Sequence, residues 1–344
     1  MPESLTLEER IDRAPGDFRI LTGDRPTGAL HLGHYFGTLQ NRVALQDRGI
    51  ETFLVIADYQ VITDRDLAGD LPGNVREILL DQLAAGIDPQ RTTFFAHSAV
   101  PALNQLLLPL LSLVSVAELG RNPTVKAETA ATGSRAMTGL MLTYPVHQAA
   151  DILFCGANLV PVGRDQLAHL EVTRVLARRF NERYSPATPL LPEPEALVGA
   201  TPTLLGVDGE KMSKSRGNAI ELRATADETA ALLKRAKTDS DRHITYDPDA
   251  RPEVSNLVLL AALCRGESPE RVAEAIGDGG SAALKKVVTE AVNDYFAPLR
   301  ARRAELAADA GALQEILARG NARANDVADR TLDAVRAAMG MVYR

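Results

Sequence analysis

The sequence predicts an α/β fold, a parallel sheet with helices on both of its faces, followed by an all-helical domain. In the first half, short apolar runs alternate with segments whose apolar residues recur at helical spacing. From about residue 222 onward the strand patterns stop and only helical patterns follow. We therefore predict two domains, residues 1–221 and residues 222–344.

The first half predicts three strands and the helices between them. The run DFRILTG predicts a strand, with a helix from about His31, and ETFLVIAD predicts a buried strand. NVREILLDQLAAG predicts a helix that a glycine ends, and QRTTFFAHS predicts the next strand. This β-α-β-α-β order is typical of a Rossmann-like sheet, which binds ligands at the carboxyl edge of its strands.

Four segments of the second half predict helices. They are ADETAALLKRAKT, SAALKKVVTEAVNDYFAPL, GALQEILARG and ANDVADRTLDAVRAAMG. In the last, Ala328, Leu332, Val335 and Met339 form one apolar stripe. We expect this last helix to pack back on the first domain.

The composition is that of an ordinary globular protein, with 45% hydrophobic and 24% charged residues in 344. No apolar run is long enough to predict a membrane span, and the acidic N-terminal segment does not resemble a signal peptide. Cys155 and Cys264 lie far apart without metal-ligand spacing, which favours the reducing cytoplasm. The net charge of −7 argues mildly against non-specific binding of nucleic acid, but not against a specific RNA partner.

The turn after the first strand, GDRPTGALHLGHYFG, carries two histidines, His31 and His34. A metal site is one interpretation, but no third ligand lies nearby in the sequence, and a core histidine is another. Gly28 and Gly33 allow the backbone to approach a flat base or a phosphate closely, and a helix N-terminus attracts anions. Imidazole N–H groups at this place would donate to phosphate oxygens. Neither the dinucleotide fingerprint nor a P-loop is present.

A second motif, LLGVDGEKMSKSRGN, places Lys211 and Lys214 three residues apart in a loop bounded by glycines. An exposed basic loop is the plain interpretation of two such lysines. The five letters KMSKS, residues 211–215, are much more specific.

With PTGALHLGH and KMSKS in this order, the chain resembles the class I aminoacyl-tRNA synthetases. The resemblance implies that the first motif holds ATP and that the second is a loop that follows the pyrophosphate. His31, His34, Lys211 and Lys214 would then be catalytic, with Mg²⁺ arriving with ATP. The implied ATP-binding residues are Arg25, Pro26, Thr27, Gly33, His34, Gly163, Arg164, Asp165, Lys211, Met212, Ser213, Lys214 and Ser215.

The stretch LTYPVHQAADILFCGANLVPVGRDQ indicates which amino acid is the substrate. Pro145 suits the first turn of a helix, with Tyr144 extended before it. Gln148 and Asp151 then share one helical face among apolar neighbours, where buried polar groups need partners: a substrate or each other. The spacing Tyr-x-x-x-Gln-x-x-Asp also fits tyrosyl enzymes.

Other features resemble the tryptophanyl branch, namely the stretch above, KTDSDRHITYDPDARPEVSNL, and the C-terminal helix. By this resemblance Asp151 would accept the indole N–H, and the pocket would be completed by Tyr144, Gln148, Val160, Val162 and Gln60. Arg25, Gln60 and the pair His147-Gln148 depart from the residues that many bacterial members carry, which indicates a divergent type.

The resemblance implies that the chain activates L-tryptophan with ATP and transfers it to tRNA(Trp). It also implies a catalytic first domain, an anticodon-binding helical domain and a homodimer. The alternatives are a tyrosine-specific ligase, and a synthetase-like protein with a regulatory or binding role.

Overall fold

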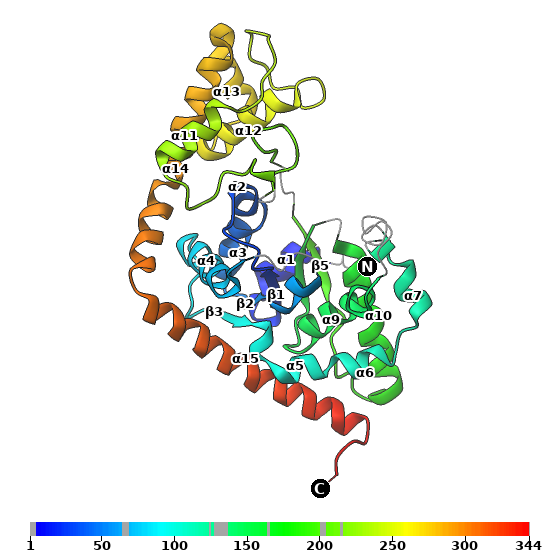
Figure 1. The fold of residues 1–344 in the computed structure, drawn as a ribbon. Helices are drawn as coiled ribbons and strands as arrows, with labels where there is room; N and C mark the ends of the chain where they lie inside the picture. The colour runs from blue at the N-terminus through cyan, green and yellow to red at the C-terminus, as the bar shows by residue number, and fades with distance from the viewer. Residues whose placement is uncertain are drawn as a thin grey trace.

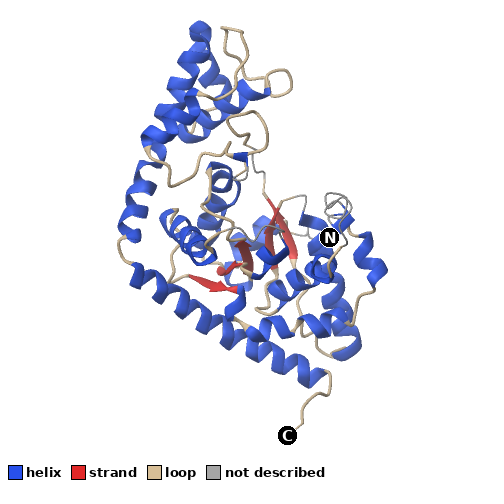
Figure 2. Ribbon diagram, viewed as in Figure 1, coloured by secondary structure: helices blue, strands red, loops and turns tan. Residues whose placement is uncertain are grey.

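The computed structural model describes residues 5–63, 69–123, 125–126, 137–163, 166–199, 204–213 and 216–343. At its centre lies a five-stranded sheet in the order β3-β2-β1-β4-β5, and every pairing in it is parallel. Helices surround this sheet (Figures 1 and 2). The predicted α/β class is confirmed. The strands are β1 (Arg19–Asp24), β2 (Glu51–Ile56), β3 (Thr92–Ala96), β4 (Leu159–Val162) and β5 (Glu195–Val198).

The helices of the α/β region follow the chain between these strands. Thr6 caps the first of them, α1, and its side chain accepts a hydrogen bond from the backbone N–H of Glu9. The helices are α1 (Leu7–Arg13), α2 (Leu32–His34), α3 (Gln40–Asp47), α4 (Leu71–Ala84), α5 (Pro101–Gln105), α6 (Leu107–Leu111), α7 (Val116–Arg121), α9 (Gly139–Leu153) and α10 (Leu167–Tyr184). A π-helical turn, η2 (Tyr35–Leu39), joins α2 to α3, and short 3₁₀ turns include η1 (Pro15–Asp17), η3 (Tyr59–Thr63) and η4 (His97–Ala99).

The two faces of the sheet bury different side chains, because successive residues of a strand point to opposite sides. On β2, Leu54 and Ile56 join a core with α4, whereas Phe53 and Val55 join a core with α9 and α10. This alternation places helices on both faces of the sheet, as predicted.

The prediction for Pro145 is wrong. Helix α9 begins at Gly139, capped by the Thr138 side chain, so Pro145 lies in its interior and Tyr144 is helical. A proline there has no N–H to give to the carbonyl four residues earlier. Packing overrides this cost, since Pro145 and Val146 are buried.

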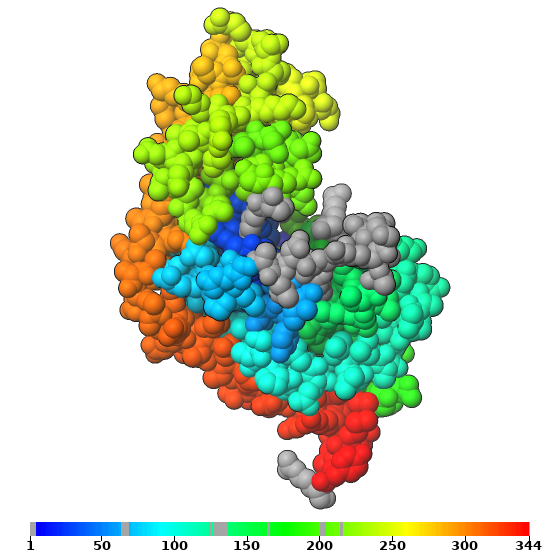
Figure 3. Space-filling view, viewed as in Figure 1, coloured from blue at the N-terminus to red at the C-terminus, as the bar shows by residue number. Residues whose placement is uncertain are grey.

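The helical region comprises α11 (Ala226–Lys234), α12 (Pro252–Arg265), α13 (Pro269–Ile276), η7 (Gly277–Gly279), α14 (Gly280–Ala307) and α15 (Ala310–Ala338). Helices α11 to α13 and the first part of α14 form a lobe beside the α/β body, and the rest of α14 and α15 run along that body (Figures 1 and 3). Buried residues of α12 and α14 share one core with those of α4 and β2.

The two helices predicted for residues 311–320 and 324–340 are one continuous helix, α15, so that part of the prediction is wrong. Its apolar stripe is confirmed: Ala328, Leu332 and Val335 are buried and Met339 packs against the same core. The glycine at position 320, in the interior of α15, is explained by the close approach of the helix to β3 at this point. A Cβ on Gly320 would come within 1.7 Å of the Phe94 carbonyl oxygen.

Among the residues described, no helix combines the length and the apolar character that a membrane span requires. Cys155 and Cys264 are free thiols, the first of them buried.

Candidate active site

The turn between β1 and α2 is fixed by buried charges. Asp24, at the end of β1, forms an ion pair of 2.5 Å with Arg42 and accepts a hydrogen bond from Gln82. Further along the turn, the Leu30 N–H donates to Asp81 Oδ2 at 2.7 Å, and Asp81 has no exposed surface. Arg25 and Thr27 are exposed on this turn, and Pro26 is buried beneath it.

His31 and His34 lie together at the start of α2. Their ring centroids are 3.8 Å apart, and the backbone N–H of His31 donates to His34 Nδ1 at 3.2 Å. Because Nδ1 accepts, the proton of a neutral His34 ring resides on Nε2. A Cβ on Gly33 would lie 3.0 Å from the His31 ring, so a larger residue here would require the ring to shift.

The loop with the KMSKS motif lies against this same turn. Residues 30–32 and 220–222 form an antiparallel bridge, in which the Leu32 N–H donates to Ile220 O and the Leu222 N–H to Leu30 O. Met212 is buried, with its sulfur 3.7 Å from the position of a Cβ on Gly33. The two motifs, far apart in the sequence, are therefore neighbours in space.

Within the loop, Asn218 holds the backbone in place. Its Oδ1 accepts from the Ser213 N–H at 2.8 Å, and its Nδ2 donates to Asp208 and to the Lys211 carbonyl. The Lys211 side chain is exposed. Lys214 and Ser215 lie outside the described residues.

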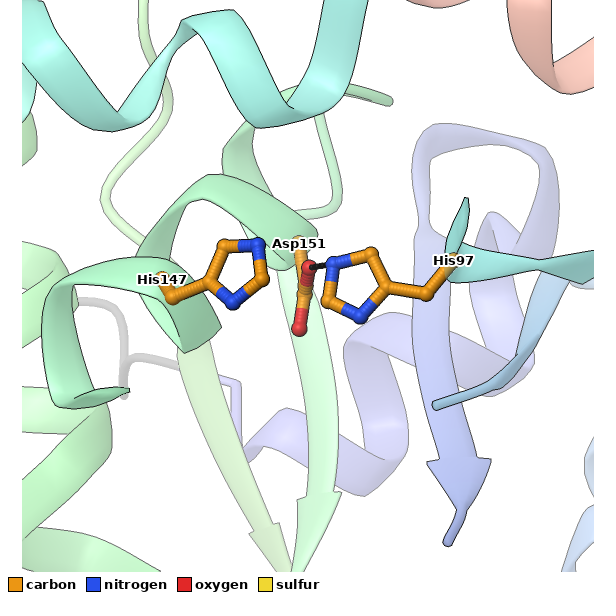
Figure 4. A group of neighbouring side chains, drawn as sticks. All are labelled: His97, His147 and Asp151. Atoms are coloured by element: carbon orange, nitrogen blue, oxygen red, sulfur yellow. Dashed lines mark ion pairs between the residues drawn. The ribbon is translucent and has the colours of Figure 1, made fainter. Parts of the chain in front are cut away.

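A second cluster lies at the ends of β2 and β3 and on α9. Asp151 of α9 is 2% exposed and His97, directly after β3, is fully buried. His97 Nε2 lies 2.7 Å from Asp151 Oδ1 as an ion pair, and Figure 4 shows the two side chains facing each other. Gln60, after β2, donates from Nε2 to Asp151 Oδ2 at 3.2 Å.

The rings of His97 and of His147 on α9 are nearly parallel, with centroids 4.3 Å apart and an interplanar angle of 17°, and they lie side by side in Figure 4. Burial lowers the pKa of His97, but the neighbouring Asp151 carboxylate outweighs it, and the pKa is raised. Burial lowers the pKa of His147, whose Nε2 lies 2.7 Å from Asn104 Oδ1. The pKa values of the two neighbouring rings are therefore shifted in opposite directions.

The remaining predicted residues lie on or beside α9 and β4. Tyr144 OH lies 3.2 Å from His169 Nε2 of α10, and Gln148 is half-buried on α9. Val160 and Val162 belong to β4, and Gly163 follows its end. Arg164 and Asp165 lie outside the described residues.

Four of the positions described above lie at the carboxyl edge of the sheet. Arg25 follows β1, Gln60 follows β2, His97 follows β3 and Gly163 follows β4. The sheet order reverses between β1 and β4, which is where open parallel sheets bind their ligands. His97 was not predicted as a site residue. Its place at the end of the predicted strand QRTTFFAHS could have indicated it, because ligands bind at the carboxyl ends of parallel strands.

A parallel sheet of this order, with a histidine-bearing turn against a KMSKS loop, is the arrangement of a class I aminoacyl-tRNA synthetase. The chain belongs to the family of class I tRNA synthetases for tryptophan and tyrosine (W and Y), whose model matches residues 13–297.

Within this family the similar proteins include tryptophan–tRNA ligases. The chain is 40% identical to that of Treponema pallidum, covering 95% of this chain and 98% of the relative. It is also 40% identical to that of Lactococcus lactis, covering 94% and 98%. A crystal structure of the tryptophanyl-tRNA synthetase from Campylobacter jejuni, complexed with ADP and tryptophan, matches with a TM-score of 0.80 at 29% identity, covering 94% of this chain and all of that one. These similarities favour tryptophan over tyrosine.

Proposed function

We propose that the chain is a tryptophan–tRNA ligase. It joins the carboxylate of L-tryptophan to the α-phosphorus of ATP, releasing pyrophosphate, and passes the acyl group from the adenylate to the terminal ribose of tRNA(Trp). The observation that carries this proposal is the contact between the turn of His31 and the loop of Met212, because it brings both sequence motifs of ATP activation together after the end of β1.

The adenylate-forming step needs no protein nucleophile, so positioning and charge stabilisation carry it. His34 Nε2 would donate to a phosphate oxygen, because its Nδ1 already accepts from the backbone. Lys211 would meet the charge that develops on the leaving pyrophosphate, and Lys214 is proposed for the same role from the motif alone. Mg²⁺ would arrive with ATP, whose phosphates it neutralises.

The amino acid would bind beside α9 and β4. Asp151 would accept the indole N–H, and Gln60 already donates to the same carboxylate. The ring pocket would include Tyr144, Gln148, Val160 and Val162. The nucleotide would contact the remaining residues of the two motifs and of the turn after β4: Arg25, Pro26, Thr27, His31, Gly33, Gly163, Arg164, Asp165, Met212, Ser213 and Ser215.

We infer the partners from the same assignment. Residues 1–221 would form the catalytic domain and 222–344 the anticodon-binding domain. A homodimer is proposed from the family assignment alone. The free thiols Cys155 and Cys264 agree with the cytoplasm.

The test is ATP–pyrophosphate exchange with purified protein. Exchange that depends on tryptophan, at least about a hundredfold better than with tyrosine, is the expected result. A preference for tyrosine would support the alternative enzyme. No exchange with either amino acid by a folded protein would support a binding role.

A further inference from the structure

The strongest feature outside the predicted site is the partner of Asp151. Its carboxylate is buried, and each of its oxygens faces a different residue, with His97 at Oδ1 and Gln60 at Oδ2. Removing a carboxylate from water is costly unless it is paired. His97 supplies that pairing from a different element of the fold.

A metal ion is the first alternative, since one ligand atom from each of His97, His147 and Asp151 lies within 4.8 Å of the others. In this structure, however, His97 Nε2 lies 2.7 Å from Asp151 Oδ1. His147 Nε2 also already lies against Asn104. Because both Nε2 atoms already contact other side chains, the geometry favours pairing between these side chains over a metal site.

The backbone around His97 is held from the opposite side by α15. Just before His97, the Ala96 N–H donates to Asn321 Oδ1 at 2.9 Å. Just after it, Asn325 Nδ2 donates to the Ala99 carbonyl at 2.8 Å. The imidazole therefore projects from a turn whose two ends are tied to one helix, and this fixes where Nε2 meets Asp151.

We propose that His97 is a positioning residue for the amino acid site: it holds Asp151 Oδ1 in the buried ion pair, so that Oδ2 is presented to the ring N–H of the substrate. The inference rests on the proposed function, because it assigns Oδ2 to the indole. An oxygen of an ionised carboxylate has a second lone pair, so Oδ2 can accept from the indole as well as from Gln60.

The same pair affects the choice between tryptophan and tyrosine. The indole nitrogen only donates, whereas a phenol both donates and accepts. An ionised carboxylate only accepts. Loss of His97 frees the carboxyl group to rotate, so that Oδ2 is no longer fixed toward the indole N–H. The preference for tryptophan should therefore fall.

The experiment is a double-mutant cycle on His97→Ala and Asp151→Ala, with kcat and KM measured by pyrophosphate exchange. We expect His97→Ala to raise the KM for tryptophan about ten- to a hundredfold, to lower the ratio of tryptophan to tyrosine exchange, and to leave the KM for ATP within about twofold. His97→Gln, which keeps a donor, should restore part of the loss. In the Asp151→Ala background, His97→Ala should change the KM for tryptophan by less than about twofold, because His97 acts through Asp151.

The matched control is His147→Gln, which changes the other imidazole ring of the cluster and leaves the ion pair in place. It should change the KM for tryptophan by less than about threefold. Thermal unfolding shows whether each variant is folded. If His97→Ala does not fold, His97→Leu replaces it in the cycle.

An unchanged KM for tryptophan in a folded His97→Ala protein would overturn the inference, as would full additivity in the cycle. Neither result would contradict the proposed function, which is tested separately by pyrophosphate exchange with the wild-type protein. Wild-type exchange with tyrosine alone would overturn the proposed function instead.

Discussion

At the scale of single residues, the histidines divide according to what the sequence could predict. His31 and His34 stand in one turn, so their spacing in the sequence alone predicts that they lie together. In the structure their ring centroids are 3.8 Å apart. His97 comes from the turn after β3 and Asp151 from α9, and nothing local in either segment indicates the other. Tertiary contacts created that pair.

Lys211 gives a prediction at this scale. Its ammonium is exposed, and in the proposed mechanism it meets charge that develops on pyrophosphate in the transition state. Lys211→Ala should lower kcat for exchange about a hundredfold, with tryptophan affinity changed far less. The matched control is Lys286→Ala, an exposed lysine of α14 whose Nζ lies 3.9 Å from Glu290. Equal rates in wild type and Lys211→Ala would contradict the assignment.

At the scale of elements, the long periodic segments were predictable and the short or kinked ones were not. Helix α4 and strands β2 and β3 match their predicted segments closely. Strands β4 and β5 have four residues each, too few for a period to stand out, and proline occurs inside β4. The continuity of α15 through Gly320 was missed because a glycine ordinarily weakens a helix, and its cause lies in the neighbouring strand.

That close approach gives the second prediction. In Gly320→Ala the new methyl would meet the Phe94 carbonyl oxygen at 1.7 Å, which forces α15 away from β3. We expect the free energy of unfolding to fall by about 1–3 kcal/mol or more, measured by urea denaturation.

The control is Gly311→Ala in the first turn of the same helix, where the nearest atom to a new Cβ is Asp309 Oδ1 at 3.4 Å. Alanine there should leave stability unchanged or raise it by up to about 1 kcal/mol. Similar losses from both substitutions would show that helix propensity, rather than the contact with β3, determines the effect.

At the scale of the whole molecule, one buried carboxylate connects the two regions of the chain. Asp81 of α4 accepts from the Leu30 N–H of the first turn and from Arg303 Nε of α14 at 2.7 Å. Arg303 also forms an ion pair with Glu77. The position of the helical region is therefore tied to the backbone of the proposed ATP-binding turn. Sequence patterns could suggest each helix but not this link, which exists only after the helices pack.

Burial raises the pKa of Asp81, although Arg303 and the Leu30 N–H act to lower it. A carboxyl whose pKa in the folded state lies above its usual value of 3.8 binds protons more tightly when folded. Its contribution to stability is therefore greatest at low pH and falls as the pH rises through the folded pKa. Removing the Arg303 guanidinium should raise the pKa of Asp81 further. The contribution of Asp81 to stability should then continue to fall up to a higher pH.

Arg303→Ala should accordingly leave an uncompensated buried charge and lower the free energy of unfolding by about 3–5 kcal/mol at neutral pH. The loss should shrink as the pH falls toward 5, because protonation of Asp81 then removes the charge. Urea denaturation at pH 5 and pH 8 measures both values, and the KM for ATP should rise as the Leu30 turn loosens. Arg302→Ala, an exposed neighbour on α14, is the control and should change stability by less than about 0.5 kcal/mol. A loss equal at the two pH values would mean that Arg303 contributes through packing of its side chain and not through the charge of Asp81.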